Sequence, residues 1–345
     1  MKSLVALALL GQILGCIAQL VSLESPIQFP DCDSPEVEHV AAIAVDYINS
    51  KTVHGFKQVL NRIEKVKVLN RRPHGKIWYL ELDLLETTCH VFSAVPAENC
   101  TVRSLHDHAV EGDCDVKIIS MDGDYKVLAT RCHSSPDSAE DIKKFCPRCG
   151  TLSALDDAGV VNAANVALSK FNAENTTVRF YRLHEISRGK HVPLPLSVVV
   201  EFAIVATNCS TQEALNHVED CQVESGENAH YGFCGATVSQ RPVIPDQPPS
   251  EDVDVHCTLF GHQGAALQAL LAQHHLRKDV LPPAVGRTVH NLIHFHNNTL
   301  ASHESNSAEK LTVASPVVKR AVVASEPGPV GTKLPCPGRV RHFRT

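Results

Sequence analysis

Long apolar runs are scarce in this chain of 345 residues. After the run from Leu4 to Leu14, no stretch approaches the roughly 20 apolar residues that a membrane-spanning helix needs. The chain also lacks the Gly-x-Ser-x-Gly, His-Glu-x-x-His and phosphate-cradling glycine-loop motifs of common enzyme classes. Its net charge of −6 argues against a nucleic-acid partner. We therefore expect no enzyme, no cofactor, no membrane insertion and no nucleic-acid binding.

The first 18 residues have the pattern of a secretory signal peptide. Lys2 is followed by the apolar run, and small residues then precede a cleavage site at Ala18. Of the 13 cysteines only Cys16 falls in this segment. The remaining even number suits disulfides in an oxidising compartment and leaves no free thiolate as a nucleophile. Four glycosylation sequons agree with an extracellular protein, which we expect to be a monomer: Asn99, Asn175, Asn208 and Asn297.

An internal repeat divides the chain into two similar modules. One cysteine quartet is echoed 120 to 125 positions later by a second: Cys89, Cys100, Cys114 and Cys132, then Cys209, Cys221, Cys234 and Cys257. Before each quartet lies a stretch with helical periodicity, Pro35 to Ile48 and Ala158 to Phe171. Ser34 can cap the first, and Asp156 or Asp157 the second. Runs typical of strands follow each helix. The sequence predicts an α+β fold with two tandem domains, each a helix packed on an antiparallel sheet.

Sequence alone leaves the disulfide connectivity open. Local pairing is the economical choice, because cysteines on adjacent strands reach bonding distance without moving the backbone. The Cys-x-x-Cys pair between the modules has no second pair and no thioredoxin-like context, so we interpret it as a tight disulfide loop rather than a zinc or redox site. The expected pairs are Cys89–Cys100, Cys114–Cys132, Cys146–Cys149, Cys209–Cys221, Cys234–Cys257 and, by remainder, Cys32–Cys336.

Acidic residues concentrate in one segment of the first module. Between Lys76 and Asp124 there are ten Asp or Glu against three Lys or Arg. Apolar and acidic residues alternate in two strand-like runs, and this period of two places the acids on one face. If the two strands share a sheet, that face carries Glu81, Asp83, Asp113 and Asp115, with Glu111 beside them. Such a grid of carboxylates suits a hard cation such as calcium, although alternating acids can also serve only to keep an exposed sheet soluble.

The composition changes in the last quarter of the chain. From Gly261 to Thr345 there are ten Lys or Arg and four Asp or Glu, with many Pro, Ser and His. We predict a mostly disordered basic tail that Cys336 tethers, with a processing site at Lys319 and Arg320. The expected organisation is 1–18 signal peptide, 27–133 first domain, 134–150 linker, 151–257 second domain and 258–345 tail.

Several segments carry a resemblance to a known family. They include Leu85 to Val91, His108 to Asp115, Ser134 to Asp141, Glu185 to Arg188 and Pro335 to Phe343. In order and spacing these segments resemble the fetuin family of the cystatin superfamily, over nearly the whole length. The resemblance implies two cystatin-like domains, and binding of calcium and calcium phosphate mineral by the acidic face of the first domain, which restrains ectopic mineralisation. It also implies phosphorylation at Ser-x-Glu or nearby serines: Ser134, Ser135, Ser138, Ser302 and Ser307.

The same resemblance leaves other functions open. Cystatins inhibit papain-like proteases with a Gln-x-Val-x-Gly hairpin, which is absent around Val66 to Asn70 and around Ile186 to Lys190. Metalloprotease inhibition is the main alternative, because fetuin-B and the snake antihaemorrhagic factors are similar to this chain. Where fetuin-B offers an aspartate to zinc, this chain has Arg148, which cannot donate a lone pair to a metal. A further alternative is binding of transforming-growth-factor-β-type cytokines or the insulin receptor, with Cys114 to Cys132 as the candidate segment.

Overall fold

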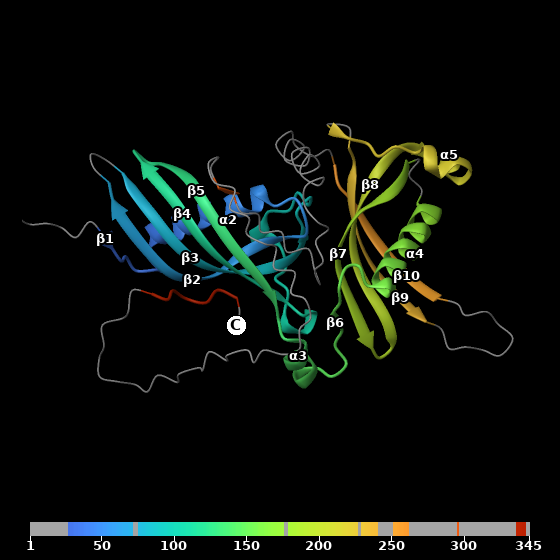
Figure 1. Ribbon diagram of the computed structural model, residues 1–345, viewed down its shortest axis with the longest axis horizontal. Helices are drawn as coiled ribbons and strands as arrows, with labels where there is room; N and C mark the ends of the chain where they lie inside the picture. The colour runs from blue at the N-terminus through green and yellow to red at the C-terminus, as the bar shows by residue number, and fades with distance from the viewer. Residues whose placement is uncertain are drawn as a thin grey trace, which may run out of the picture.

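The computed structural model describes residues 27–71, 75–175, 179–226, 229–240, 251–261, 295–296 and 336–342. It forms two α+β units, each with one long helix against an antiparallel sheet (Figure 1). This confirms the predicted fold class. Within the described ranges, no helix combines the length and the apolar character needed to cross a membrane. Outside these ranges lie the expected signal peptide, Asn297, Ser302, Ser307, Lys319 and Arg320.

The first unit is a six-stranded sheet wrapped on one helix. Its elements are β1 (Ile27–Gln28), α2 (Pro35–Lys51), β2 (Phe56–Asn70), β3 (Lys76–His90), β4 (Val110–Met121), β5 (Asp124–Pro136) and β11 (Phe295–His296), with 3-10 turns at Ala97–Asn99 and Leu105–Asp107. The strands are ordered β1-β2-β3-β4-β5-β11. Neighbours among β1 to β5 follow one another along the chain, as in a meander. Residues on opposite strands are therefore placed by hairpin register.

The second unit repeats this plan with five strands in the order β10-β9-β8-β7-β6. Its elements are β6 (Thr151–Leu152), α4 (Ala158–Glu174), β7 (Arg179–Pro193), β8 (Leu196–Ser210), α5 (Thr211–His217), β9 (Tyr231–Gln240) and β10 (Glu251–Leu259), with a 3-10 turn at Val218–Asp220. The short helix α3 (Ala139–Phe145) lies in the linker. Ile186 to Lys190, which we considered as a hairpin motif, instead lies within β7 and pairs with β8. The β7–β8 turn is at Pro193 to Leu196.

Helix periodicity and strand alternation explain the two cores. The buried face of α2 meets the even-numbered residues of β3 and β4, such as Leu82 and Val116, so the odd-numbered residues face away from the helix. In the second unit, a Cβ on Gly189 would come within 2.6 Å of Val160 Cγ1, which shows how closely α4 approaches β7. Asp157 caps α4 by accepting hydrogen bonds from two backbone amides. Ser34 occupies the N-cap position of α2 but makes no side-chain cap, because Pro35 fixes that first turn without one.

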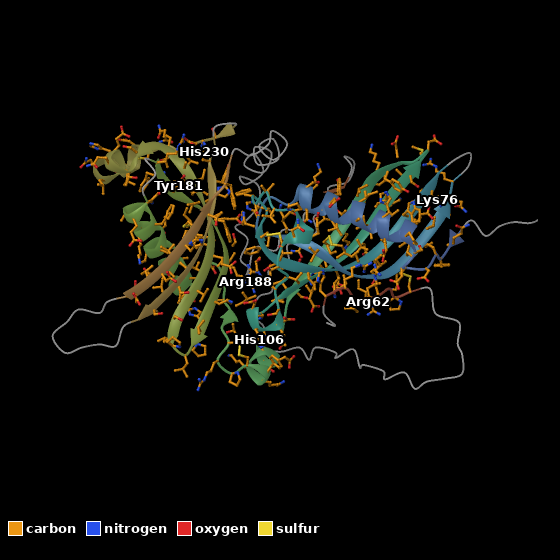
Figure 2. The ribbon with its side chains drawn as sticks, turned by 180° about the vertical axis from the view of Figure 1, so that it is seen from behind. Arg62, Lys76, His106, Tyr181, Arg188 and His230 are labelled. Atoms are coloured by element: carbon orange, nitrogen blue, oxygen red, sulfur yellow. A yellow bond between two sulfur atoms is a disulfide. The ribbon has the colours of Figure 1, made fainter. Side chains whose placement is uncertain are left out.

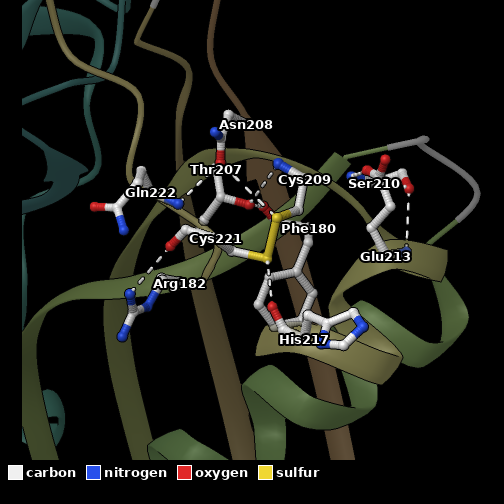
Figure 3. Close-up of a disulfide and its surroundings, with 10 residues drawn as sticks. All are labelled: Phe180, Arg182, Thr207, Asn208, Cys209, Ser210, Glu213, His217, Cys221 and Gln222. Atoms are coloured by element: carbon white, nitrogen blue, oxygen red, sulfur yellow. Dashed lines mark hydrogen bonds between the residues drawn. A yellow bond between two sulfur atoms is a disulfide. The ribbon is translucent and has the colours of Figure 1, made fainter. Parts of the chain in front are cut away.

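Six disulfides join the expected cysteines, five of them by local pairing and Cys32–Cys336 by remainder. They are Cys32–Cys336, Cys89–Cys100, Cys114–Cys132, Cys146–Cys149, Cys209–Cys221 and Cys234–Cys257. Figure 3 shows the bond between Cys209, at the end of β8, and Cys221, after the helical insertion. Ser210 and Glu213 form a reciprocal capping box at the start of α5. The disulfide and the capping box together fix this short helix to the sheet.

The two units meet through the face of the second sheet that α4 does not cover (Figure 1). Phe92 of the first unit packs among Ala203, Val205 and Tyr231 of the second. Beside this apolar cluster lies Arg188, which Figure 2 shows at the junction of the two sheets. Its guanidinium donates to Glu86 of β3 at 2.5 Å and to the backbone oxygens of Asp107 and His108. These buried contacts fix the acidic end of the first sheet next to the second unit.

Candidate functional site

The candidate site is the face of the first sheet opposite α2, which we call the outward face. Its side chains form rows across β2, β3, β4 and β5, because residues paired in antiparallel register share a face. The rows are Lys67–Tyr79–Lys117–Ala129, Lys65–Glu81–Asp115–Arg131 and Arg62–Asp83–Asp113–His133, followed by Leu85–Glu111–Ser135. Four carboxylates thus form a block on the two central strands. Strand spacing sets them about 4.8 Å apart across the strands and about 6.7 Å apart along them.

The register brings together the acids that the sequence singled out, but not all of them reach solvent. Asp113 and Asp115 are exposed, while Glu81 and Glu111 are partly covered. Asp83 is only 6% exposed and accepts a hydrogen bond from Asn61 Nδ2 at 2.8 Å. The expectation that Asp83 faces solvent is therefore wrong. Alternation identifies the face on which a side chain lies, whereas its exposure depends on neighbouring strands.

Cations border the central carboxylates on both sides. Lys65 Nζ lies 2.6 Å from Glu81 Oε2, Arg62 is opposite Asp83, and Arg131 is opposite Asp115. Figure 2 shows Arg62 on the first sheet near the carboxyl-terminal segment. The sequence predicted a grid of acids with few cations nearby. The structure instead has an acidic centre with basic residues on both sides. The acidic stretch of sequence comprises only β3 and β4, and the sheet adds the cations of β2 and β5 beside it.

The charge of the outward face changes from one end to the other. At the end distant from the second unit, the row through Tyr79 carries Lys67 and Lys117 and no acid. At the near end, Glu111 lies close enough to Asp83 and to Asp137, which directly follows β5, to be repelled by both. Asp137 was not among the predicted site residues, because only the hairpin register brings it to Glu111.

Three carboxyl groups at the near end have raised pKa values. Burial, followed by repulsion from Asp137, Asp83 and Asp113, raises the pKa of Glu111 to about 7. Burial also raises the pKa of Asp83 to about 6, against the opposing hydrogen bond from Asn61. Burial is likewise the main cause that raises the pKa of Asp137 to about 6. A divalent cation placed among these carboxylates relieves the same repulsion that a proton relieves.

The carboxyl-terminal segment lies along the free edge of β2. The Gly338 amide donates to Ile63 O at 2.8 Å, and the Arg341 amide donates to Asn61 O at 3.0 Å. Arg339 and Arg341 contact Glu38 of α2, at 2.8 Å and 3.2 Å. The segment therefore pairs with the part of β2 that supplies Asn61, the hydrogen-bond donor to Asp83.

The expected modification sites occupy two kinds of position. Ser135 is exposed and directly opposite Glu111, so a phosphate there would extend the acidic end of the outward face, and half-buried Ser134 precedes it. Ser138 caps α3 and accepts from the Asp141 amide. The sequon residues Asn99 and Asn208 are exposed, and Asn175 is half-buried. The Asn208 carboxamide oxygen accepts a hydrogen bond from the backbone amide of Gln222, as Figure 3 shows.

The linker forms a second exposed feature. Cys146 and Cys149 close a short loop in which Pro147 and Arg148 are exposed. Thr151 then pairs with His191 near the β7–β8 turn, where Leu194 and Leu196 are 66% and 62% exposed. The pairing of Thr151 with His191 thus brings the exposed loop near the exposed apolar turn.

The comparisons with known proteins agree with this architecture. The Cystatin domain family matches residues 150–243. Among solved structures, mouse fetuin-B in complex with crayfish astacin is 26% identical with a TM-score of 0.58, covering 70% of this chain and 75% of that chain. Mouse fetuin-B in an inhibitory complex with human meprin beta is 27% identical with a TM-score of 0.59, covering 70% and 76%. The fold thus defines a tandem cystatin-like protein, a class of non-enzymatic binding proteins and inhibitors.

Two relatives match this chain over its full length and identify its family. Alpha-2-HS-glycoprotein of Mus musculus is 42% identical over 100% of both chains. Antihemorrhagic factor cHLP-B of Gloydius brevicauda is 44% identical, also over 100% of both. The chain belongs to the alpha-2-HS-glycoprotein, or fetuin, family, which confirms the resemblance drawn from its segments.

Proposed function

We propose that this chain is a secreted plasma glycoprotein that binds calcium and calcium phosphate through the outward face and inhibits mineral growth. One observation carries the proposal: Glu81 is directly opposite Asp115 and Asp83 is directly opposite Asp113 on the two central strands. This register produces a compact block of carboxylates on a rigid sheet. Carboxylate oxygens are the ligands that calcium prefers.

These acids differ in solvent exposure and therefore have different roles in the proposed binding. Exposed Asp113 and Asp115 make the first contact with calcium at the surface of a mineral cluster. Glu81 must exchange its Lys65 partner for calcium, a modest cost because Lys65 is 74% exposed. Buried Asp83 supports the arrangement through Asn61 rather than by direct contact with mineral. Many weak contacts on one surface act together, and the bound protein then blocks addition of further ions.

The test is a precipitation assay with supersaturated calcium phosphate. The variant D113N/D115N removes the two exposed carboxylates and should inhibit precipitation several-fold less than wild type. The variant D122N/D124N is the matched control, because it removes equal charge from exposed positions at the β4–β5 turn. Equal inhibition by D113N/D115N and wild type, with both proteins folded, would contradict the proposal.

Metalloprotease inhibition is a second candidate. The two fetuin-B structures named above are complexes with metalloproteases, and one close relative is named an antihemorrhagic factor. The exposed Cys146–Cys149 loop gives this chain a feature that a protease cleft can accept. Arg148 cannot ligate zinc, so inhibition here would depend on steric blocking of the cleft. Measuring astacin activity with increasing amounts of the full chain tests this, and undiminished activity at micromolar concentrations would exclude it.

A further inference from the structure

A groove of about 500 Å³ lies at the end of the outward face distant from the second unit. Four cations line it: Lys65 and Lys67 from β2, Lys117 from β4 and Arg131 from β5. Two carboxylates, Glu81 and Asp115, also reach it. Apolar side chains such as Phe29 and Ala129 also line the groove, and among its charged side chains the cations are in excess.

Tyr79 organises the centre of this groove. Two ammonium groups lie over its ring, with Lys67 Nζ 5.8 Å and Lys117 Nζ 5.4 Å from the ring centroid. The three residues occupy one row of the sheet on adjacent strands. Contact with the ring faces holds both ammoniums over the groove.

Lys67 and Lys117 differ from the other ring-bound lysine of this sheet. Lys76 lies 5.3 Å from the Trp78 ring centroid, but its Nζ is also 2.6 Å from Glu36 Oε1. Within the described residues, neither Lys67 nor Lys117 makes an ion pair with a carboxylate. These two charges are therefore available to an anionic ligand.

The two carboxylates indicate which anion fits. At neutral pH inorganic phosphate retains a proton, and its P–OH can donate a hydrogen bond to a carboxylate such as Asp115. Sulfate is fully ionised, so it can only accept and is repelled by the same group. A groove that combines ammoniums with an exposed carboxylate therefore favours hydrogen phosphate over sulfate.

We propose that this groove is a phosphate-binding site, in which the ammoniums of Lys67 and Lys117 hold a hydrogen phosphate ion beside Tyr79. This deepens the proposed function and rests on it: the carboxylate block binds the calcium of a mineral cluster while the groove binds its phosphate. The outward face thereby contacts both ions of the solid along one sheet.

The direct test uses the full secreted chain with its lysines ¹³C-methylated, a modification that keeps their charge. Sodium phosphate is added without calcium, and the Lys67 and Lys117 signals, assigned with K67R and K117R, are followed by NMR. Both signals should shift saturably, and Lys76 should not. Sodium sulfate at equal ionic strength should give smaller shifts. Absence of shifts at Lys67 and Lys117, an equal shift at Lys76, or an equal response to sulfate would overturn the proposal.

A second measurement separates this site from the calcium-binding block. K67Q/K117Q should weaken inhibition of calcium phosphate precipitation by about two- to fivefold, as expected for loss of two exposed charge contacts. Its affinity for calcium chloride alone should remain unchanged, and K67R/K117R should retain inhibition because guanidinium also binds phosphate. Loss of inhibition in D113N/D115N with normal inhibition in K67Q/K117Q would refute the groove alone. Normal inhibition in both variants would refute the proposed function as well.

Discussion

Arg188 of β7 donates a hydrogen bond to Glu86 of β3 at 2.5 Å, and the two side chains are only 1% and 3% exposed. The pair joins the two domains in a setting nearly free of solvent. Arg103 adds to it, lying 2.9 Å from Glu86 and 2.5 Å from Glu201 of β8. Two of these ion pairs, Arg188 with Glu86 and Arg103 with Glu201, therefore cross from one domain to the other.

The first prediction concerns this junction. The variant R188M leaves Glu86 buried with one cation fewer and two backbone carbonyls without their donor. We expect the free energy of unfolding to fall by about 3–5 kcal/mol, as for other broken buried pairs. Urea unfolding under oxidising conditions, followed by circular dichroism, measures it. The control is K144M, which breaks the exposed pair of Lys144 with Asp141 and should cost less than about 0.5 kcal/mol. Equal losses in the two variants would contradict a structural role for the junction.

The second prediction is a pH dependence of stability at Glu111. Its pKa is raised to about 7 in the folded chain, so the folded state binds its proton more tightly than the unfolded state does. The ionised carboxylate therefore destabilises the fold above pH 7, and stability is gained as the pH falls towards the ordinary Glu value. E111Q should be more stable than wild type by about 1 kcal/mol at pH 8, allowing for partial exposure, and no more stable near pH 4. Urea midpoints of both proteins at the two pH values provide the test, with exposed D122N as the control. A constant difference across this range would contradict the raised pKa.

The third prediction concerns the basic flank of the carboxylate block. K65Q removes the cation that pairs with Glu81 and leaves that carboxylate free for calcium. Calcium affinity should rise by about twofold, the size expected for loss of an exposed competing charge. Isothermal titration with calcium chloride measures this. K144Q removes the same charge from α3, away from the outward face, and should leave the affinity unchanged. An unchanged affinity in K65Q would mean that Glu81 takes no part in calcium binding.

The fourth prediction concerns the linker loop. R148D places a carboxylate between Cys146 and Cys149, where the present guanidinium has no lone pair to offer. Because an aspartate can ligate catalytic zinc, R148D should inhibit astacin at least about tenfold more strongly than wild type. R148N separates loss of positive charge from gain of a ligand. Similar inhibition by R148D and R148N would exclude zinc ligation at this position.

Local patterns in the sequence were sufficient for the two long helices, the repeated domains and the five disulfides between cysteines close in the sequence. Periodicity over Pro35 to Ile48 matches the start of α2, and the cysteine quartets follow hairpins that keep partners close in sequence. The alternation in β3 and β4 also placed Asp113 and Asp115 correctly on one face.

The same patterns could not give the environment of that face. Lys65 and Arg131 come from strands whose register with β3 and β4 is decided by turns and bulges, and this information is non-local. Asp83 accepts a hydrogen bond from Asn61, and Asn61 in turn accepts one from Arg341, which is far away in the chain. Arg188 has no sequence signal at all, since an arginine in an alternating strand ordinarily points to water.

The bond between Cys32 and Cys336 joins positions 304 residues apart in the chain. It makes nearly the whole polypeptide one covalent ring. A protease that hydrolyses a single peptide bond between these cysteines therefore opens the ring without releasing a fragment, and the product stays in one piece until a reductant is added. Nicked and intact molecules then keep the same outward face, and electrophoresis after reduction tells them apart.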